Sequence, residues 1–119
     1  MRVAFVLFER LTALDFVGAY DPITRLGSMG VVDEFEWDLC ARKEGVTDDR
    51  GLSFTPDVVG ASLADYDLLV VPGGHGTDAL QHDDAFLDWL RTAAPVPLKA
   101  SVCTGSILLG AAGFLEGRR

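Results

Sequence analysis

The sequence predicts an α/β fold in which a doubly wound, mostly parallel sheet carries helices on both faces. The first observation is a set of three apolar runs, at residues 3–8, 66–71 and 98–102. Strands that are buried on both faces have such runs instead of an alternating pattern. The second observation is that helical segments separate these runs, which is typical of parallel sheets. Ligands of such sheets bind beyond the carboxyl ends of the strands.

Size and composition set the limits of the prediction. The chain has 119 residues, so we expect residues 1–119 to form a single domain. Its 49% hydrophobic and 24% charged residues are typical of a globular protein. Eighteen acidic against ten basic residues give a net charge of −8. This charge repels phosphate backbones and anionic lipids, and we therefore expect neither nucleic acid nor membranes as partners.

The sequence favours a cytoplasmic location. The first apolar run is too short for a secretory signal, and Glu9 and Arg10 follow it directly. No stretch reaches the roughly 18 uninterrupted apolar residues of a membrane span. In a reducing compartment, Cys40 and Cys103 are expected to remain unpaired.

A helix is predicted over residues 13–26, between the first strand and a region that starts near Gly27. Thr12 is the expected N-cap, because a hydroxyl can accept a hydrogen bond from the first turn. Pro22 removes one helical hydrogen bond and predicts a bend or a restart. The residues expected to share one face are Leu14, Val17 and Asp21.

Two further segments lie before the second apolar run. Residues 34–40 alternate polar with apolar side chains, which predicts an edge strand with one solvated face. Residues 42–59 are rich in Gly, Asp and Thr around an apolar patch at 52–54. This composition indicates an irregular excursion or a small hairpin.

The second half begins with the strand at 66–71 and a tight loop at 72–76. A helix follows, with Asp83 and Asp84 in its first turn and an end near Pro95. Its expected buried stripe is Phe86, Leu87 and Leu90, flanked by Trp89. The run at 98–102 is predicted to be a third buried strand, and residues 104–113 the next helix.

Cys103 lies where this strand turns into a helix of small residues, which is the pattern of a nucleophile elbow. Such a turn exposes a short side chain beside the first amides of the helix. We expect this helix end to lower the thiol pKa. The sheet topology brings Asp15 and the loop at 73–74 to the same edge.

Each of these residues also has an ordinary structural interpretation. Cys40, outside any elbow, is expected to be structural, and Asp15 can be a solvated turn residue. The pair Gly73-Gly74 can simply end a strand. His75 lies in the loop near the thiol and can act as acid or base, but loop histidines are more often only exposed. Two histidines without a Cys/His cluster predict no metal site.

Three sequence motifs, taken in order along the chain, resemble those of the ThiJ/PfpI superfamily, which has the class I glutamine amidotransferase-like fold. They are LDFVG at 14–18, VPGGHG at 71–76, and SVCTG at 101–105 followed by LGAAG at 109–113. The resemblance covers essentially the whole chain. It implies a flavodoxin-like sheet, no cofactor and a small-molecule substrate.

Thr104 follows the cysteine, where the peptidases and glyoxalase-type members of the superfamily commonly carry histidine. This matches the isonitrile hydratase-like branch. The resemblance then implies Cys103 as the nucleophile, Asp15 as the residue that handles the proton, and Thr104 as its polar helper. Substrate and developing negative charge are expected at the loop of Gly73, Gly74 and His75.

The chemistry of hydration supports these residue types. An isonitrile needs attack on its terminal carbon, a proton on that carbon, and water to release an N-substituted formamide. A thiolate and a nearby carboxylate disfavour each other, so Cys103 and Asp15 are expected to share one proton. The amides of Gly74 and Thr104 are expected to receive negative charge on the substrate.

Other functions remain open at this point. The same fold with a similar Asp and Cys occurs as a sensing domain in regulators that carry a helix-turn-helix part. A redox-responsive or chaperone-like thiol protein needs only the reactive cysteine. Superfamily members normally continue past the elbow helix, so the strand at 98–102 is left with an open edge. We therefore expect a homodimer or a higher oligomer.

Overall fold

The computed structural model describes residues 1–30 and 34–114. Within them, five parallel strands form one sheet in the order β5-β2-β1-β6-β7. The strands of this sheet are β1 (Arg2–Leu7), β2 (Glu36–Ala41), β5 (Val58–Val59), β6 (Leu68–Val71) and β7 (Leu98–Ser101). The predicted α/β fold with a parallel sheet is confirmed.

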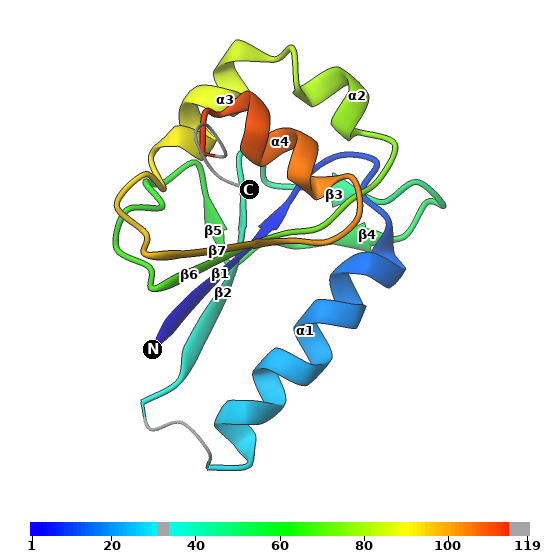
Figure 1. The fold of residues 1–119 in the computed structure, drawn as a ribbon. Coiled ribbons are helices and arrows are strands. Elements are labelled where there is room, and N and C mark those ends of the chain that lie inside the picture. Colours follow the sequence, from blue (N-terminus) through cyan, green and yellow to red (C-terminus); the bar gives the residue numbers. More distant parts are fainter. Residues whose placement is uncertain (31–33, 115–119) are drawn as a thin grey trace.

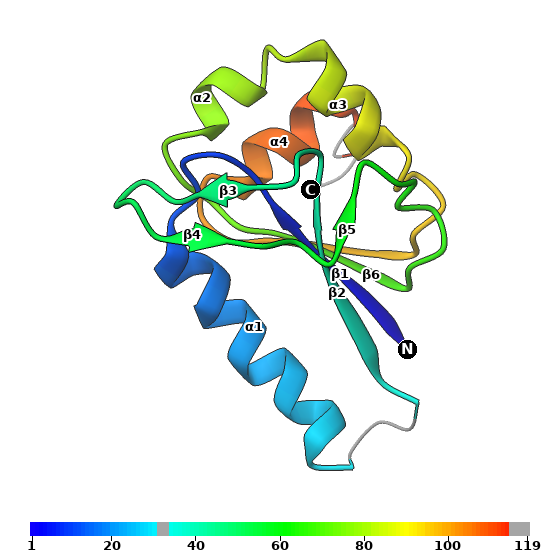
Figure 2. The ribbon, with the colours of Figure 1, turned by 180° about the vertical axis from the view of Figure 1, so that it is seen from behind.

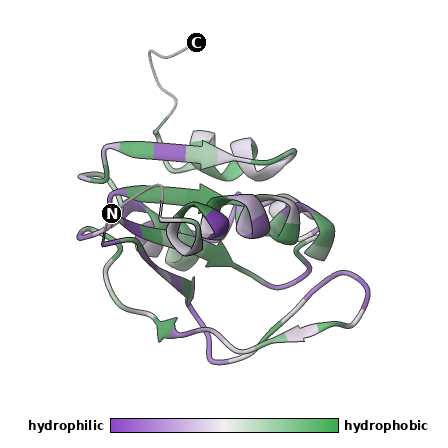
Figure 3. Cartoon of the chain, turned by 90° about the horizontal axis from the view of Figure 1, so that it is seen from below, coloured by the Kyte–Doolittle hydropathy of each residue, from purple (hydrophilic) through white to green (hydrophobic). Residues whose placement is uncertain are grey.

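Helices cover both faces of the sheet (Figure 1). The helix α1 (Ala13–Ser28) lies on one face, and α2 (Thr77–Leu80), α3 (Asp84–Arg91) and α4 (Gly105–Ala111) lie on the other, as the view from behind also shows (Figure 2). The central strands are therefore buried on both sides: residues 3–7 of β1 are fully inaccessible. Figure 3 shows these strands as hydrophobic. Among the described residues, no helix is long and apolar enough to cross a membrane.

The face of α1 that packs on the sheet differs from the predicted one. Phe16 and Tyr20 stack against Phe5 of β1, with ring centroids 6.0 and 5.3 Å away. Leu14 and Val17 instead point outward and are 78% and 47% exposed. Phe16 and Tyr20 are four residues apart and therefore lie on the same face of the helix, and each edge-to-face aromatic pair adds about 0.5–1.5 kcal/mol.

Two local details of α1 differ from the expectation: the helix does not restart at Pro22, and the N-cap residue Thr12 forms no capping hydrogen bond. The helix continues through Pro22, which lies on its exposed side, where water can satisfy the carbonyl that the proline leaves free. Thr12 occupies the N-cap position but forms no capping bond. Its hydroxyl donates to Asp49 Oδ2 at 2.9 Å instead, and so ties the start of α1 to another segment.

The region after β2 forms a small hairpin of β3 (Val46–Thr47) and β4 (Ser53–Phe54), as one of the two interpretations expected. The chain then returns to the sheet as β5, so β2 is not the edge strand that its alternation predicted. β5 pairs with the last two residues of β2, and Asp57 Oδ2 accepts the amide of Leu39 at 2.8 Å. A side chain thus takes the place of part of a neighbouring strand.

The second half follows the prediction in α3, but the short helix α2 was not predicted and β7 is more exposed than expected. In α3 the predicted apolar stripe is buried, and Asp83 caps the helix by accepting the amide of Phe86 at 3.1 Å. The strand β7 is not a buried strand. It lies at the edge of the sheet in the described residues, and Leu98 is 53% exposed.

Candidate active site

The elbow at Cys103 joins β7 to α4 in a strained conformation. Cys103 has φ = 50°, in the left-handed region that non-glycine residues rarely adopt. The amide of Val102 donates to the carbonyl of Val71 at 3.0 Å and extends the strand pairing to the turn itself. A side chain at Gly105 would overlap the carbonyl oxygen of Val71. The backbone is therefore held on both sides of the cysteine, and the thiol is exposed.

The glycine loop after β6 fixes the start of α1 beside this elbow. The carbonyl of Gly73 accepts the amide of Thr12 at 2.9 Å, and Gly74 forms a bridge with Leu11. Gly74 has φ = +148°, and a Cβ there would lie 2.6 Å from the carbonyl oxygen of Arg10. Only glycine permits this close approach. The loop thus brings the first turn of α1 to the carboxyl edge of β7.

The consequence is a contact between two side chains that are far apart in sequence. Cys103 Sγ lies 3.7 Å from Asp15 Oδ1, close enough for the thiol to donate a hydrogen bond to the carboxylate. Asp15 is half-buried and Cys103 is exposed, so solvent and a small substrate can reach the sulfur. Cys103 and Asp15 are the two residues that the sequence placed at this edge.

The charge of Asp15 outweighs the helix end in its effect on the thiol. The carboxylate raises the pKa of Cys103 above its ordinary value, with smaller contributions from partial desolvation and the hydrogen bond. The predicted lowering of the thiol pKa is therefore corrected. The seven residues of α4 supply only a partial charge, whereas Asp15 supplies a full negative charge next to the sulfur. The raised pKa favours the protonated thiol at neutral pH.

Replacement of Asp15 by Asn should lower the pKa of Cys103, because it removes the main cause of the raised value. The pH dependence of alkylation by iodoacetamide measures this pKa directly. Asp78→Asn is the matched control, since Asp78 lines the same pocket and makes no hydrogen bond to the thiol within the described residues. An unchanged or higher pKa in Asp15→Asn would contradict the electrostatic origin of the shift.

Thr104 connects the elbow to the glycine loop. The amide of Gly74 donates to Thr104 Oγ1 at 3.0 Å, and a Cβ at Gly73 would lie 2.8 Å from the same oxygen. The Gly74 amide is therefore occupied, contrary to the expectation that it receives charge from the substrate. The amide of Thr104 donates to no acceptor within the described residues, so it remains available to a ligand.

An open pocket of about 330 Å³ surrounds the thiol. It is lined by Thr12, Asp15, Gly74, His75, Thr77, Asp78, Cys103 and Thr104. Neither lysine nor arginine is among these described residues, and two of them are carboxylates. Such a site suits a neutral or cationic ligand better than an anion.

Asp49 is a residue of the site that no sequence motif indicates. Its carboxylate, 14% exposed, lies 3.9 Å from His75 Nε2 and accepts the hydroxyl of Thr12. The loop histidine is exposed, as one interpretation expected, but it lines the pocket and has a carboxylate beside it. No sequence signal pointed to Asp49, because only the hairpin of β3 and β4 carries it back to the start of α1. The described residues contain no group of three or more His, Cys, Asp or Glu placed to hold a metal ion.

Known proteins are similar to this chain in sequence and in fold. An isonitrile hydratase of Pseudomonas putida is 37% identical over 121 residues, which cover the whole chain and 50% of that protein. A helix-turn-helix transcriptional regulator of Mycobacterium tuberculosis is 34% identical over 59 residues, 49% of this chain and 23% of the regulator. The chain thus spans half the length of the hydratase.

Solved structures show the same arrangement. Oxidized DJ-1 of Toxoplasma gondii superposes with a TM-score of 0.76 over 98% of this chain and 63% of that one, at 22% identity. At that identity the likeness establishes the fold alone. The pattern of the DJ-1/PfpI family matches residues 1–119 in full. The resemblance drawn from the three sequence motifs is confirmed, and the chain belongs to the DJ-1/PfpI family.

Proposed function

We propose that the chain acts as a cysteine-dependent, isonitrile hydratase-like enzyme, which converts isonitriles to N-substituted formamides. The observation that carries the proposal is the 3.7 Å contact between Cys103 Sγ and Asp15 Oδ1. The 37% identity to an isonitrile hydratase supports it, as does the absence of lysine and arginine from the described pocket lining, because an isonitrile carries no net charge.

In the proposed first step, Asp15 accepts the thiol proton while the sulfur attacks the terminal carbon of the isonitrile. The new C–S bond places negative charge on that carbon, and Asp15 returns the proton to it. The product of this step is a thioimidate bound to Cys103. The backbone amide of Thr104 is available to stabilise the developing negative charge. Thr104 Oγ1 accepts the amide of Gly74 and so holds the glycine loop beside the elbow.

In the second step, water adds to the thioimidate carbon, the C–S bond breaks, and the sulfur regains a proton. The nitrogen also takes up a proton. Overall, one isonitrile and one water molecule are converted to one N-substituted formamide. His75, beside Asp49, lines the pocket and can accept a proton from the attacking water. No cofactor takes part in this scheme.

Turnover of cyclohexyl isocyanide tests the proposal. Incubation with the folded chain should release N-cyclohexylformamide, detected by mass spectrometry, at a rate proportional to protein concentration. A folded protein that releases no formamide above the buffer rate would overturn the hydratase proposal.

A sensing domain is the second candidate, supported by the match to a transcriptional regulator over 59 residues. It predicts saturable isonitrile or small-molecule binding in the Cys103 pocket without turnover. The third alternative, a redox or chaperone-like thiol protein, is weakened because the raised pKa of Cys103 reduces the thiolate fraction.

We further propose a cytoplasmic homo-oligomer. Two free thiols, Cys40 and Cys103, suit a reducing compartment, and β7 presents an open edge within the described residues. Multi-angle light scattering should show a dimer or a larger species. A single monodisperse monomer at micromolar concentration would contradict it.

A further inference from the structure

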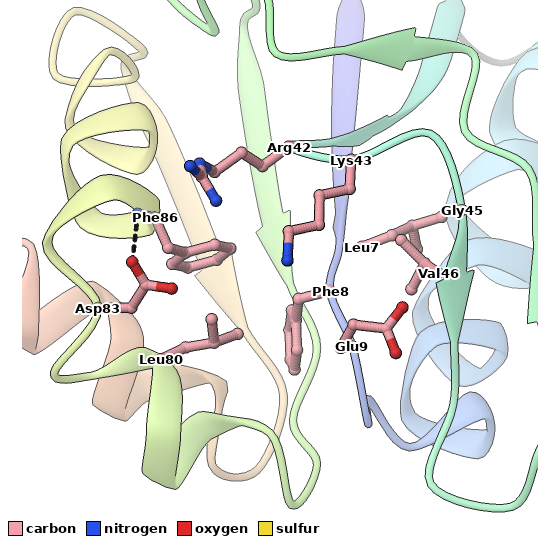
Figure 4. Close-up of a pocket in the computed structure, with 10 residues that line it drawn as sticks. All are labelled: Leu7, Phe8, Glu9, Arg42, Lys43, Gly45, Val46, Leu80, Asp83 and Phe86. Atoms are coloured by element: carbon pink, nitrogen blue, oxygen red, sulfur yellow. Dashed lines mark hydrogen bonds between the residues drawn. The ribbon is translucent and has the colours of Figure 1, made fainter.

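A second pocket lies at the carboxyl ends of β1 and β2, on the face of the sheet that carries α3 (Figure 4). We call it the β1–β2 pocket. It is lined by Leu7, Phe8, Glu9, Arg42, Lys43, Gly45, Val46, Leu80, Asp83 and Phe86, and its volume is about 80 Å³. None of these residues lines the Cys103 pocket. The carboxyl ends of parallel strands are the usual place for ligands in such sheets.

The floor of the β1–β2 pocket is apolar and rigid. The rings of Phe8 and Phe86 meet edge to face, with centroids 6.2 Å apart, and both residues are 3% exposed. Leu7 and Val46 are buried beside them. The volume corresponds to two or three waters at about 30 Å³ each, so the floor admits a short apolar chain.

The mouth of the pocket carries two cations. Arg42 and Lys43 are exposed, and their side chains extend from the end of β2 toward the pocket (Figure 4). Within the described residues, neither side chain forms an ion pair or a hydrogen bond, whereas Arg2, Arg25 and Arg91 each have an aspartate.

The two carboxylates of the pocket, Glu9 and Asp83, form no ion pair with these cations within the described residues. Asp83 Oδ1 accepts the amide of Phe86 at 3.1 Å as the cap of α3. Glu9 Oε1 accepts the amide of Thr47 at 3.1 Å. Each carboxylate keeps its charge but forms no ion pair with Arg42 or Lys43 within the described residues, so the donors of these two side chains remain available to a ligand.

We propose that the β1–β2 pocket binds a short-chain aliphatic carboxylate, with its chain on Phe8 and Phe86 and its carboxylate between Arg42 and Lys43. A guanidinium binds a carboxylate through two parallel hydrogen bonds, and an adjacent ammonium adds charge. In a chain with a net charge of −8, a pair of uncommitted cations over an apolar floor selects an anion that also has an apolar part.

Titration with butyrate, followed by amide chemical shifts at constant ionic strength, tests the site. We expect saturable shifts at the amides of Lys43, Leu80 and Phe86. Arg42→Gln and Lys43→Gln should each weaken binding about tenfold, the range of a lost charge-assisted bond. Arg50→Gln is the matched control, because the substitution removes the same charge. Arg50 is exposed and lines neither pocket. It should leave the affinity within twofold.

Three comparisons decide whether the site has the proposed chemistry. From acetate to propionate to butyrate, affinity should rise about fourfold per added CH₂, while butyramide should bind at least tenfold more weakly. Equal shifts from inorganic phosphate would reduce the site to a general anion patch and overturn the proposal. Absence of saturable shifts, or an unchanged affinity in Arg42→Gln, would also overturn it. Cys103→Ala should bind butyrate as the parent chain does, so this test is independent of the hydratase proposal.

Discussion

Cys103→Ala should abolish formamide release from cyclohexyl isocyanide, with a loss of about 10⁴-fold or more, because the variant has no atom to form the C–S bond. The assay follows N-cyclohexylformamide by mass spectrometry, with urea denaturation to show that the variant is folded. Cys40→Ala is the matched control: Cys40 is buried, its pKa is raised to about 11 by burial, and it lines neither pocket. That control should keep its turnover per folded molecule. Retained activity in Cys103→Ala would refute the nucleophile assignment.

Asp15→Asn separates two roles that the carboxylate can have. If Asp15 only raised the pKa of the thiol, the variant would contain more thiolate and react faster with the isonitrile. If Asp15 carries the proton from sulfur to carbon, turnover should fall about 10²- to 10⁴-fold even though the thiol pKa falls. We expect the second result, in which alkylation at neutral pH becomes faster while hydration becomes slower. Faster hydration in Asp15→Asn would remove Asp15 from the proton path.

Gly76→Ala should be strongly destabilising, at about 3 kcal/mol or with loss of folding. A Cβ at this buried residue would overlap the backbone carbonyl oxygen of Glu9. That carbonyl cannot move freely, because Glu9 also holds Thr47 through its side chain and β1 is buried in the sheet. Urea denaturation gives the free energy of unfolding.

The matched control is Gly18→Ala. Gly18 lies within α1, and a Cβ there would meet no atom within 4 Å. Alanine is the better helix former, so this variant should gain about 0.5–1 kcal/mol. If Gly76→Ala proves as stable as the parent chain, this result would contradict the close contact between the glycine loop and the segment that follows β1.

Prediction from sequence succeeded where burial determines the pattern of apolar residues along an element, or where a turn requires a particular residue type. The unbroken runs of β1 and β6 and the stripe of α3 reflect burial on both faces of a sheet and on one face of a helix. Prediction failed where a neighbour decided the outcome. The alternation of β2 predicted an edge strand with one solvated face, but burial rises along the strand from Glu36 to Ala41, and the return of the chain as β5 and Asp57 covers its edge.

The features of the candidate site also fall into those that the local sequence predicts and those that tertiary packing determines. The elbow, the glycine loop and Asp15 follow from local chemistry: a short nucleophile at a strand-to-helix turn, glycines where backbones meet, and a carboxylate on an apolar helix. The sign of the thiol pKa shift depends on a distance, 3.7 Å between Sγ and Oδ1, that no local pattern contains. The position of Asp49 likewise depends on tertiary packing, because the hairpin of β3 and β4 brings it against the start of α1.

The sequence by itself determined the class of the fold and the family, and it predicts Cys103 as the reactive thiol, because each depends on residue type and spacing along one segment. The tertiary structure alone decided which carboxylates lie beside the thiol and the loop histidine, which backbone amide remains available, and where two uncommitted cations meet an apolar floor. These properties depend on distances between segments tens of residues apart. Such distances are set by the packing of helices and loops on the sheet, which the local pattern of residues does not encode.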